Sequence, residues 1–407
     1  MPETAPASPL ALALRRFASR RGAQLGIALC AAFALVALYA PLLASDVAIV
    51  WWDDAGFRLP LLADLFNRRS YPKHHDLLFS VAGLLLPAIA TGWWLLRRRW
   101  SASRRVLAAA GLVLCGWLLA MLPLLPDGRG GWQAVWSDRP SSACTAEAAR
   151  ASGAWTIFPL VPHRYDAAYA GAVLKPPGTV NPASGRGFLL GTDQVGFDVF
   201  ARMAFGTRIS LTIGLLATGI ALAIGTVIGA LSGYLGGWVD LVLQRLVEIM
   251  MCFPTFILVL VVVAMLGRDI FIITWVLGLT GWAGAARLVR GEFLAQSGRD
   301  YVLACRAAGL PAARIMFRHV LPNCMTPLLI SATFGVAGSV GLESGLAFIG
   351  LGDANVPSWG MLLNQGRENI AFGWLIWVPG LAVFLLVMSL NMVGNGLREA
   401  LDPKASP

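Results

Sequence analysis

Few side chains in this sequence have the types and spacing that chemistry requires. His163, Arg164 and Asp166 place a base, a cation and a carboxylate close together, as an acid–base site would. No nucleophile motif completes them, so they support an enzyme only weakly. His74 and His75 are adjacent, which is poor spacing for joint ligation of a metal ion from a helix, and no cysteine is near them. We therefore predict no catalytic residues and no metal site.

The sequence also lacks the usual means of holding ATP. A Gly-x-x-x-x-Gly-Lys-Ser/Thr loop binds phosphates through backbone amides and its lysine. The three lysines, Lys73, Lys175 and Lys404, each follow a residue other than glycine. We predict no cofactor in this chain, so ATP and magnesium, if they power it, are used by another chain.

The elements that must position these side chains are apolar. Of 407 residues, 57% are hydrophobic and only 13% charged, against about 25% charged in an average soluble protein. Crossing the membrane takes roughly 20 apolar residues, and eight uncharged runs reach or approach that length. They are 22–45, 77–96, 106–126, 209–239, 249–267, 270–286, 320–342 and 369–397. We predict an all-α polytopic membrane protein with eight spans.

Two of these runs need comment. The first is much longer than the roughly 7–15-residue apolar core of a cleaved signal peptide, which favours an uncleaved anchor. Only Arg268 and Asp269 separate the fifth and sixth runs, which predicts a tight hairpin between two spans.

Arginines indicate the orientation, because short cytoplasmic loops are the basic ones. Two short loops on the other side each contain a single basic residue, Arg268 in one and Arg367 in the other. The predicted cytoplasmic residues include Arg15, Arg16, Arg20, Arg21, Arg97, Arg98, Arg99, Arg104, Arg105, Arg245, Arg287, Arg290, Arg299, Arg306, Arg314, Arg318, Arg398 and Lys404. Both termini are thus predicted to be cytoplasmic. The net charge of +10 follows from this topology and from contact with anionic lipid headgroups, rather than from a nucleic-acid surface.

The predicted chain divides into five parts. Residues 1–45 hold the N-terminus and first span, 46–126 an outside segment and two spans, 127–208 an outside loop, 209–397 the remaining spans, and 398–407 a cytoplasmic tail. The stretch from 127 to 190 is rich in Gly, Pro, Ser and Ala, which break regular structure. Either a small ordered domain or a capping loop fits it.

The most informative segment is the predicted cytoplasmic loop 299–323, RDYVLACRAAGLPAARIMFRHVLPN. It predicts two short helices with a break between them. Asp300 is placed to cap or favour the N-terminus of the first. Gly309 ends that helix and Pro311 suits the first turn of the next. Pro322 is expected to stop the second helix before the following span.

One face of the first predicted helix is small. Tyr301, Ala304, Cys305 and Ala308 fall at i, i+3, i+4 and i+7, so they share a face. Small side chains allow another protein to approach closely. A docking helix and an ordinary amphipathic helix lying on lipid are both compatible with this pattern.

This segment resembles the coupling loop of ABC-importer permeases. That loop has a Glu-Ala-Ala pattern, a glycine a few residues later, and then Ile and Leu-Pro. Leu303 stands here in place of the glutamate and Cys305 in place of the second alanine. The resemblance implies that an ATPase contacts Tyr301, Leu303, Ala304, Cys305, Arg306, Ala308, Gly309, Ile315, Leu321 and Pro322.

Further motifs extend the resemblance over about 220 residues. The stretch 191–198, GTDQVGFD, is similar to the Gly-Thr-Asp-x-x-Gly-Arg-Asp signature of peptide-type permeases, with Phe197 replacing the arginine. Its matching residues are Gly191, Thr192, Asp193, Gly196 and Asp198. Other matching segments are GTRISL at 206–211, GYLGGWVD at 233–240, TGWAGAARLVRGEFL at 280–294, AFIGLGDANVPSWG at 347–360 and GNGLREALDP at 394–403. Together they resemble the second permease of oligopeptide, dipeptide and nickel importers.

The resemblance implies a type I permease core of six helices in the bacterial inner membrane, here with two inserted spans near 77–96 and 106–125. It also implies four partners besides the lipid bilayer: a second, homologous permease, two cytosolic ATPases and a periplasmic binding protein. Peptides or peptide-like solutes are the implied cargo, with nickel or another small solute as the alternative. The enlarged outside loop is similar to a subgroup linked to longer peptides and microcin C.

Glu343 lies near the outer end of the seventh run. An ionisable group at membrane depth is a functional hypothesis by default. Contact with a substrate amine or a gate, and a solvated position at the interface, are both open.

Overall fold

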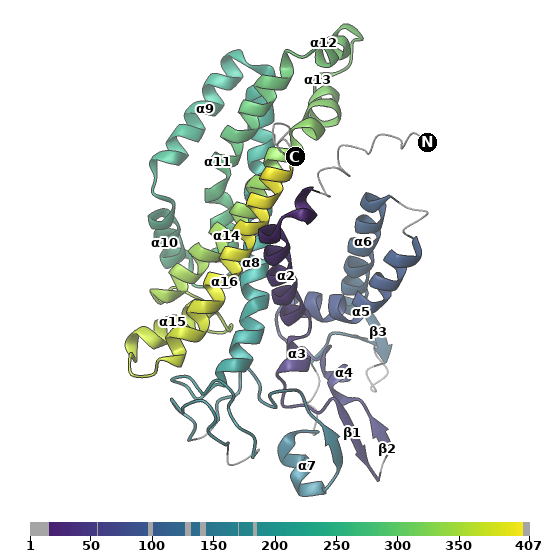
Figure 1. The fold of residues 1–407 in the computed structure, drawn as a ribbon, viewed down its shortest axis with the longest axis vertical. Coiled ribbons are helices and arrows are strands. Elements are labelled where there is room, and N and C mark those ends of the chain that lie inside the picture. The colour runs from purple at the N-terminus through teal and green to yellow at the C-terminus, as the bar shows by residue number, and fades with distance from the viewer. Residues whose placement is uncertain are drawn as a thin grey trace. The chain divides into compact units, whose positions relative to one another are not determined.

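A computed structural model describes residues 16–54, 56–96, 101–126, 132–138, 144–169, 171–181 and 185–401. Helices dominate these residues (Figure 1). The expectations for Arg15, Arg97, Arg98, Arg99, Asp402, Pro403 and Lys404 concern positions outside them.

The chain forms two compact units. The first unit comprises Met1–Phe33, Ser210–Asn364 and Trp377–Pro407, within the described ranges. The second unit comprises Ala34–Ile209 and Gln365–Ile376. Helix α8, Val199–Leu235, contributes residues to both.

Within the described residues, seven helical stretches are long and apolar enough to cross a membrane. They contain α2 (Arg21–Leu38), α5 (His74–Leu96), α6 (Ala102–Met121), α8, α11 (Ile270–Ser297), α14 (Met325–Phe348) and α16 (Trp374–Leu401). An eighth crossing is supplied if α9 (Gly237–Cys252) and α10 (Thr255–Leu266), bent by 79°, act as one span. The eight predicted spans correspond to these seven stretches and the bent α9–α10 pair.

Helix α9 corrects the predicted boundary between the fourth and fifth spans. Residues 240–248 are helical, not a cytoplasmic loop. The prediction was wrong because the three charged residues of this stretch end the apolar run, although all three are paired: Asp240 with Arg290, and Arg245 with Glu248. The predicted hairpin between α10 and α11 is confirmed. Asp269 begins α11 by accepting a hydrogen bond from the Phe271 amide at 2.8 Å.

Helices α8 and α11 pack unusually closely in the first unit. Three glycines at one-turn intervals on α8 face backbone carbonyls at one-turn intervals on α11. An added Cβ at Gly225, Gly229 or Gly233 would lie 2.8, 2.4 or 2.7 Å from the carbonyl oxygen of Trp282, Ala286 or Arg290, respectively. Such small-residue stripes let membrane helices approach until their backbones touch.

The second unit adds short strands, which the all-α prediction did not include. Strands β1 (Val50–Asp53), β2 (Gly56–Arg58) and β5 (Trp155–Ile157) form a sheet in the order β2-β1-β5. Strands β3 (Pro123–Pro126) and β4 (Trp132–Ala134) form a second pair. Part of the 127–190 stretch is therefore ordered, because β5 pairs with β1 from the outside segment before the inserted spans.

Short helices complete the second unit. They are α3 (Ala40–Leu43), α4 (Pro60–Asp64) and α7 (Ala146–Ser152). Helix α15 (Trp359–Glu368) follows the loop after α14.

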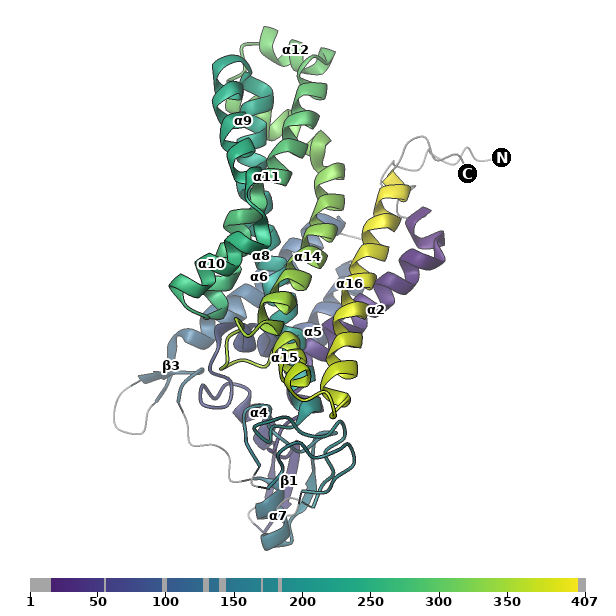
Figure 2. The ribbon, with the colours of Figure 1, turned by 90° about the vertical axis from the view of Figure 1, so that its left-hand side faces the viewer.

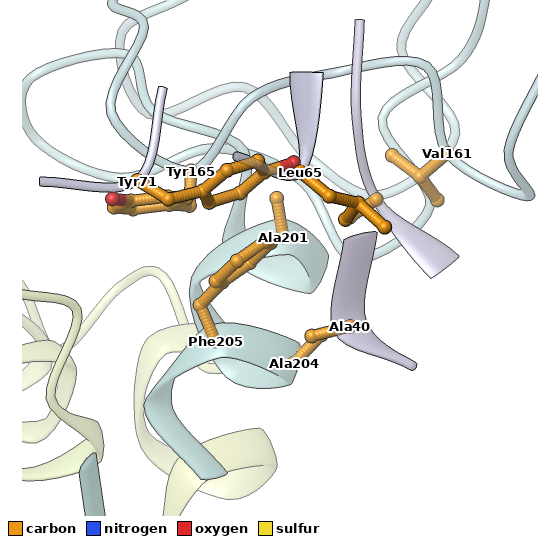
Figure 3. Close-up of a cluster of buried hydrophobic side chains, with 9 residues drawn as sticks. Ala40, Leu65, Tyr71, Val161, Tyr165, Ala201, Ala204 and Phe205 are labelled. Atoms are coloured by element: carbon orange, nitrogen blue, oxygen red, sulfur yellow. The ribbon is translucent and has the colours of Figure 1, made fainter. Parts of the chain in front are cut away.

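An aromatic core holds the second unit together (Figure 3). The Tyr165 and Phe205 ring centroids lie 4.4 Å apart, and Tyr71 stacks on Phe205 at 5.9 Å. Ala201 and Ala204 of α8 pack on the same cluster. Burial raises the pKa of the Tyr71 and Tyr165 hydroxyls, so both stay neutral. This core anchors the first turns of α8.

Candidate functional site

The 299–322 segment contains the predicted helix, break and second helix. Helix α12 spans Asp300–Ala307, and α13 spans Ala312–Arg314 with Pro311 as its N-cap. Gly309 has a φ of +72° between them, a conformation that glycine adopts readily. Arg299 occupies the N-cap of α12, so Asp300 is a first-turn acid and not the cap.

The expected stop at Pro322 is wrong. A π-helical stretch, Ile315–Val320, and a 3-10 turn, Leu321–Cys324, connect α13 to α14 without a break. Pro322 lies in the first turn of the 3-10 stretch, where its missing N–H is tolerated. Irregular helical turns of this kind often occur at functional sites.

The small face predicted for α12 is split in the structure. Tyr301 and Cys305 pack against a buried cluster that includes Phe293 of α11. Ala304 and Ala308 are exposed instead. Of the other residues assigned to ATPase contact, Leu303, Arg306, Gly309 and Pro322 are exposed, Leu321 is partly buried and Ile315 is buried.

The outward surface of this segment is apolar with basic residues around it. Leu303 is 48% exposed and Phe317 is 43% exposed. Exposed arginines accompany them, namely Arg299, Arg306, Arg314 and Arg318. In both ribbon views α12 lies at one end of the first unit, beyond the ends of α9 and α11 (Figures 1 and 2). This end is therefore available to a protein that prefers apolar contact and carries acidic groups.

The 191–198 segment in the second unit is a tight buried turn. Gly191 has a φ of +77°, and a Cβ there would lie 2.6 Å from the Lys175 carbonyl oxygen. Gly196 is also buried. Glycine at 191 is thus required both by conformation and by space.

Its polar side chains are buried and satisfied. Asp193 accepts hydrogen bonds from the Val195 and Phe197 amides, both at 2.9 Å. Thr192 donates to the Ala172 carbonyl and accepts from the Lys175 amide. These contacts give both side chains a role in holding the turn.

Asp198 begins α8. Its Oδ1 accepts a hydrogen bond from the Ala201 amide at 2.8 Å, as a capping carboxylate does. Its Oδ2 lies 3.1 Å from Nδ1 of His163, and both side chains are fully buried. The His163 ring also stacks on Phe188 at 4.5 Å. Sequence reasoning missed this pair, because no local pattern connects residues 35 positions apart.

These contacts separate the three residues first considered for acid–base chemistry. His163 pairs with Asp198, whereas Arg164 forms a two-point ion pair with Asp166 at 2.8 and 2.9 Å. The described residues also contain no group of three His, Cys, Asp or Glu side chains placed to hold a metal ion.

Phe197 stands where the peptide-permease signature has an arginine, and another arginine takes the place of that side chain. The Arg202 guanidinium lies 4.8 Å from the centroid of the Phe197 ring, and its Nη1 is 3.4 Å from Asp193. An arginine from the next turn of α8 therefore reaches the place beside Asp193, and Phe197 stacks on it.

Glu343 is buried in the first unit, with 4% of its surface exposed. The Ser358 hydroxyl donates to Glu343 Oε1 at 2.7 Å, and the Ser344 hydroxyl lies 3.4 Å from Oε2. The solvated alternative is therefore wrong. Its contact with a substrate or gate stays a prediction.

Comparison with known proteins agrees with this arrangement. The family of binding-protein-dependent transport system inner membrane components matches residues 225–407. The dipeptide transport system permease protein DppC of Alkalihalophilus pseudofirmus is 37% identical over 216 residues, covering 53% of this chain and 71% of that protein. The oligopeptide transport system permease protein OppC of Haemophilus influenzae is 38% identical over 216 residues, covering 53% and 70%.

A solved chain of the MetNI methionine ABC transporter, in an inward-facing conformation, aligns with 49% of this chain and 96% of its own length. Its identity is 17% and its TM-score 0.39. The sequence relatives decide the family. This chain belongs to the inner membrane components of binding-protein-dependent transport systems, and it is a multi-pass permease subunit.

Proposed function

We propose that this chain forms half of the translocation pathway of an ATP-driven importer for peptides or peptide-like solutes. The carrying observation is the exposed apolar surface of the 299–322 segment at one end of the first unit. The names of the relatives, dipeptide and oligopeptide permeases, support peptides as the cargo.

The partners follow from this role. A second, homologous permease completes the pathway, and two cytosolic ATPases use ATP and magnesium. A periplasmic binding protein delivers the cargo. Both termini face the cytoplasm, in agreement with the arginines in the predicted cytoplasmic loops.

The mechanism requires the 299–322 segment to carry force. ATP-driven closure of the ATPases moves α12, which packs through Tyr301, Val302 and Cys305 onto α8 and α11. The first unit then changes between two packings, one open to each side of the membrane. The free energy comes from the ATPases, and this chain supplies the contact and the bistable helices.

Ala304→Glu tests the docking surface, because Ala304 is exposed and its replacement leaves the core of α12 intact. A buried carboxylate without a partner is strongly unfavourable at an interface. We expect the assembled transporter to lose its ATPases on purification, and peptide uptake to fall at least tenfold.

Ala295→Glu is the matched control, because Ala295 is also exposed and lies in the last turn of α11, just before α12. It should retain the ATPases. If Ala304→Glu keeps wild-type ATPase content and uptake, the assignment of the 299–322 segment fails.

A further inference from the structure

An ion pair inside the first unit connects α9 to α11. Arg290 donates to Asp240 through Nε at 2.6 Å and through Nη2 at 2.7 Å. The side chains are only 30% and 20% exposed. Two-point pairs of this kind fix orientation as well as distance.

Asp240 also closes the corner between α8 and α9. The Ser232 hydroxyl, in the last turn of α8, donates to Asp240, and the Gln244 amide donates to the Ser232 oxygen at 3.0 Å. Between the two helices the chain turns at Gly236 and Gly237, whose φ values are +66° and +53°. Without these side-chain contacts, a Gly-Gly turn would leave the direction of α9 weakly determined.

The 299–322 segment touches the same corner. The Arg306 guanidinium of α12 lies 4.8 Å from the centroid of the Tyr234 ring, and its Nε is 3.3 Å from the Tyr234 hydroxyl. Tyr234 belongs to the last turn of α8. Helix α11, which carries Arg290, continues through Gly298 and Arg299 into α12. The corner is therefore contacted from α11 and from α12.

The pair is not needed to hold α8 against α11. The glycine stripe Gly225, Gly229 and Gly233 already brings those two helices into backbone contact. Helix α9 has an apolar contact farther along, where Val247 packs near Trp282, but apolar contacts permit sliding. What Asp240–Arg290 adds is a fixed orientation of α9 relative to α11.

We propose that the Asp240–Arg290 pair transmits movement of the 299–322 segment to the bent α9–α10 pair. Asp240 and Arg290 are positioning residues, because they act through α9 and not on the cargo. This inference rests on the proposed function and goes beyond ATPase docking. It states which internal contact turns a push on α12 into movement of a spanning element.

The test uses the complete transporter in liposomes, with its ATPases and binding protein. Asp240→Asn, Arg290→Gln and the double variant are compared for ATPase content, ATP hydrolysis and peptide uptake. We expect wild-type ATPase content and at least a fivefold loss of uptake per ATP hydrolysed for each single variant. The double variant should be no worse than the worse single variant, since the two residues act as one unit.

Arg245→Gln is the matched control on α9. It breaks an exposed ion pair with Glu248 and should leave uptake per ATP unchanged. Wild-type coupling in Asp240→Asn and Arg290→Gln, or an equal loss in Arg245→Gln, overturns the inference.

Failure of the unaltered chain to bind an ATPase would instead refute the proposed function. If neither single variant assembles, Arg290→Lys decides the question, because it keeps the charge but not the two-point geometry. Reduced uptake per ATP supports the inference, and a wild-type ratio overturns it.

Discussion

Glu343 shows how a single carboxylate is tolerated within a span. The Ser358 hydroxyl comes from the loop between α14 and α15, and it donates a 2.7 Å hydrogen bond to Glu343. Ser358 in turn accepts from the Gly360 amide at 3.2 Å. The carboxylate therefore fixes the loop between α14 and α15 at the start of α15.

Ser358→Ala should destabilise the first unit. It removes the better of the two donors to a buried carboxylate, which costs about 1–3 kcal/mol. Thermal unfolding in detergent is the measurement, and a lower midpoint is expected. Glu343→Gln is the companion variant, because an amide oxygen still accepts from Ser358. Equal midpoints for wild type and Ser358→Ala would contradict this account.

The identity of a residue was predictable where the local backbone geometry requires one residue type. The signature at 191–198 was identified from the sequence, and its Gly191 and Asp198 have local roles in a turn and a cap. Their distant partners were not predictable. His163 is 35 positions away from Asp198, and Ser358 lies in a segment that matches the family as a whole, so neither pattern shows which carboxylate the residue contacts.

At the scale of elements, the contact between α8 and α11 depends on the absence of side chains. Each glycine in the stripe faces a carbonyl of the other helix, and the backbone cannot shift as a flexible side chain can. Helices α8 and α11 therefore form one rigid pair, and α12 packs on it.

Gly229→Ala should separate these helices. The new Cβ would lie 2.4 Å from the Ala286 carbonyl oxygen, and overpacking of this kind destabilises by about 1–3 kcal/mol. Gly219→Ala on the same helix meets nothing within 4 Å and should be neutral or slightly stabilising. A thermal midpoint of Gly229→Ala equal to that of Gly219→Ala would show that the stripe is not close-packed.

Elements were predictable where glycine, proline or charge marks their ends clearly. The break at Gly309 and the hairpin at Arg268–Asp269 are examples. Helix α9 was missed because Asp240 and Arg245 read as loop residues. Strands β1, β2 and β5 were missed because three or four residues are too few to show an alternating pattern.

At the scale of the whole molecule, Arg208 connects the first inserted span, α5, to α2 and α8 within the second unit. This arginine is fully buried. It donates to the Ala37 carbonyl at the end of α2 at 2.7 Å, and to Asp76 in the first turn of α5 at 3.2 Å. One side chain thus joins three helices of that unit, α2, α5 and α8.

Arg208→Leu should disrupt this unit strongly, because it leaves Asp76 buried without its cation. Breaking a buried pair in this way costs about 3–5 kcal/mol. The double variant Arg208→Leu/Asp76→Leu removes both charges and should recover part of the loss. Yield and thermal midpoint of the purified chain measure both. A double variant less stable than Arg208→Leu would contradict the pairing.

The sequence predicted the inserted spans and their number, because apolar length alone identifies them. It did not predict their attachment. Arg208 lies within a motif matched to the family, and Asp76 marks only the end of an apolar run. Nothing in either pattern shows that the two charges meet.

The Arg208 contact also sets an order of events during synthesis. The Ala37 carbonyl accepts its hydrogen bond from Arg208, which lies 171 residues later in the chain. At roughly 5–20 residues per second, that interval lasts about 10–30 s. During it, the end of the first helix and the Asp76 carboxylate have both been made, but neither has its final partner. The ends of the first two spans near Ala37 and Asp76 can therefore reach their final contacts only after Arg208 has been made, so a ribosome stalled before Arg208 would hold a membrane intermediate with these groups still unpaired.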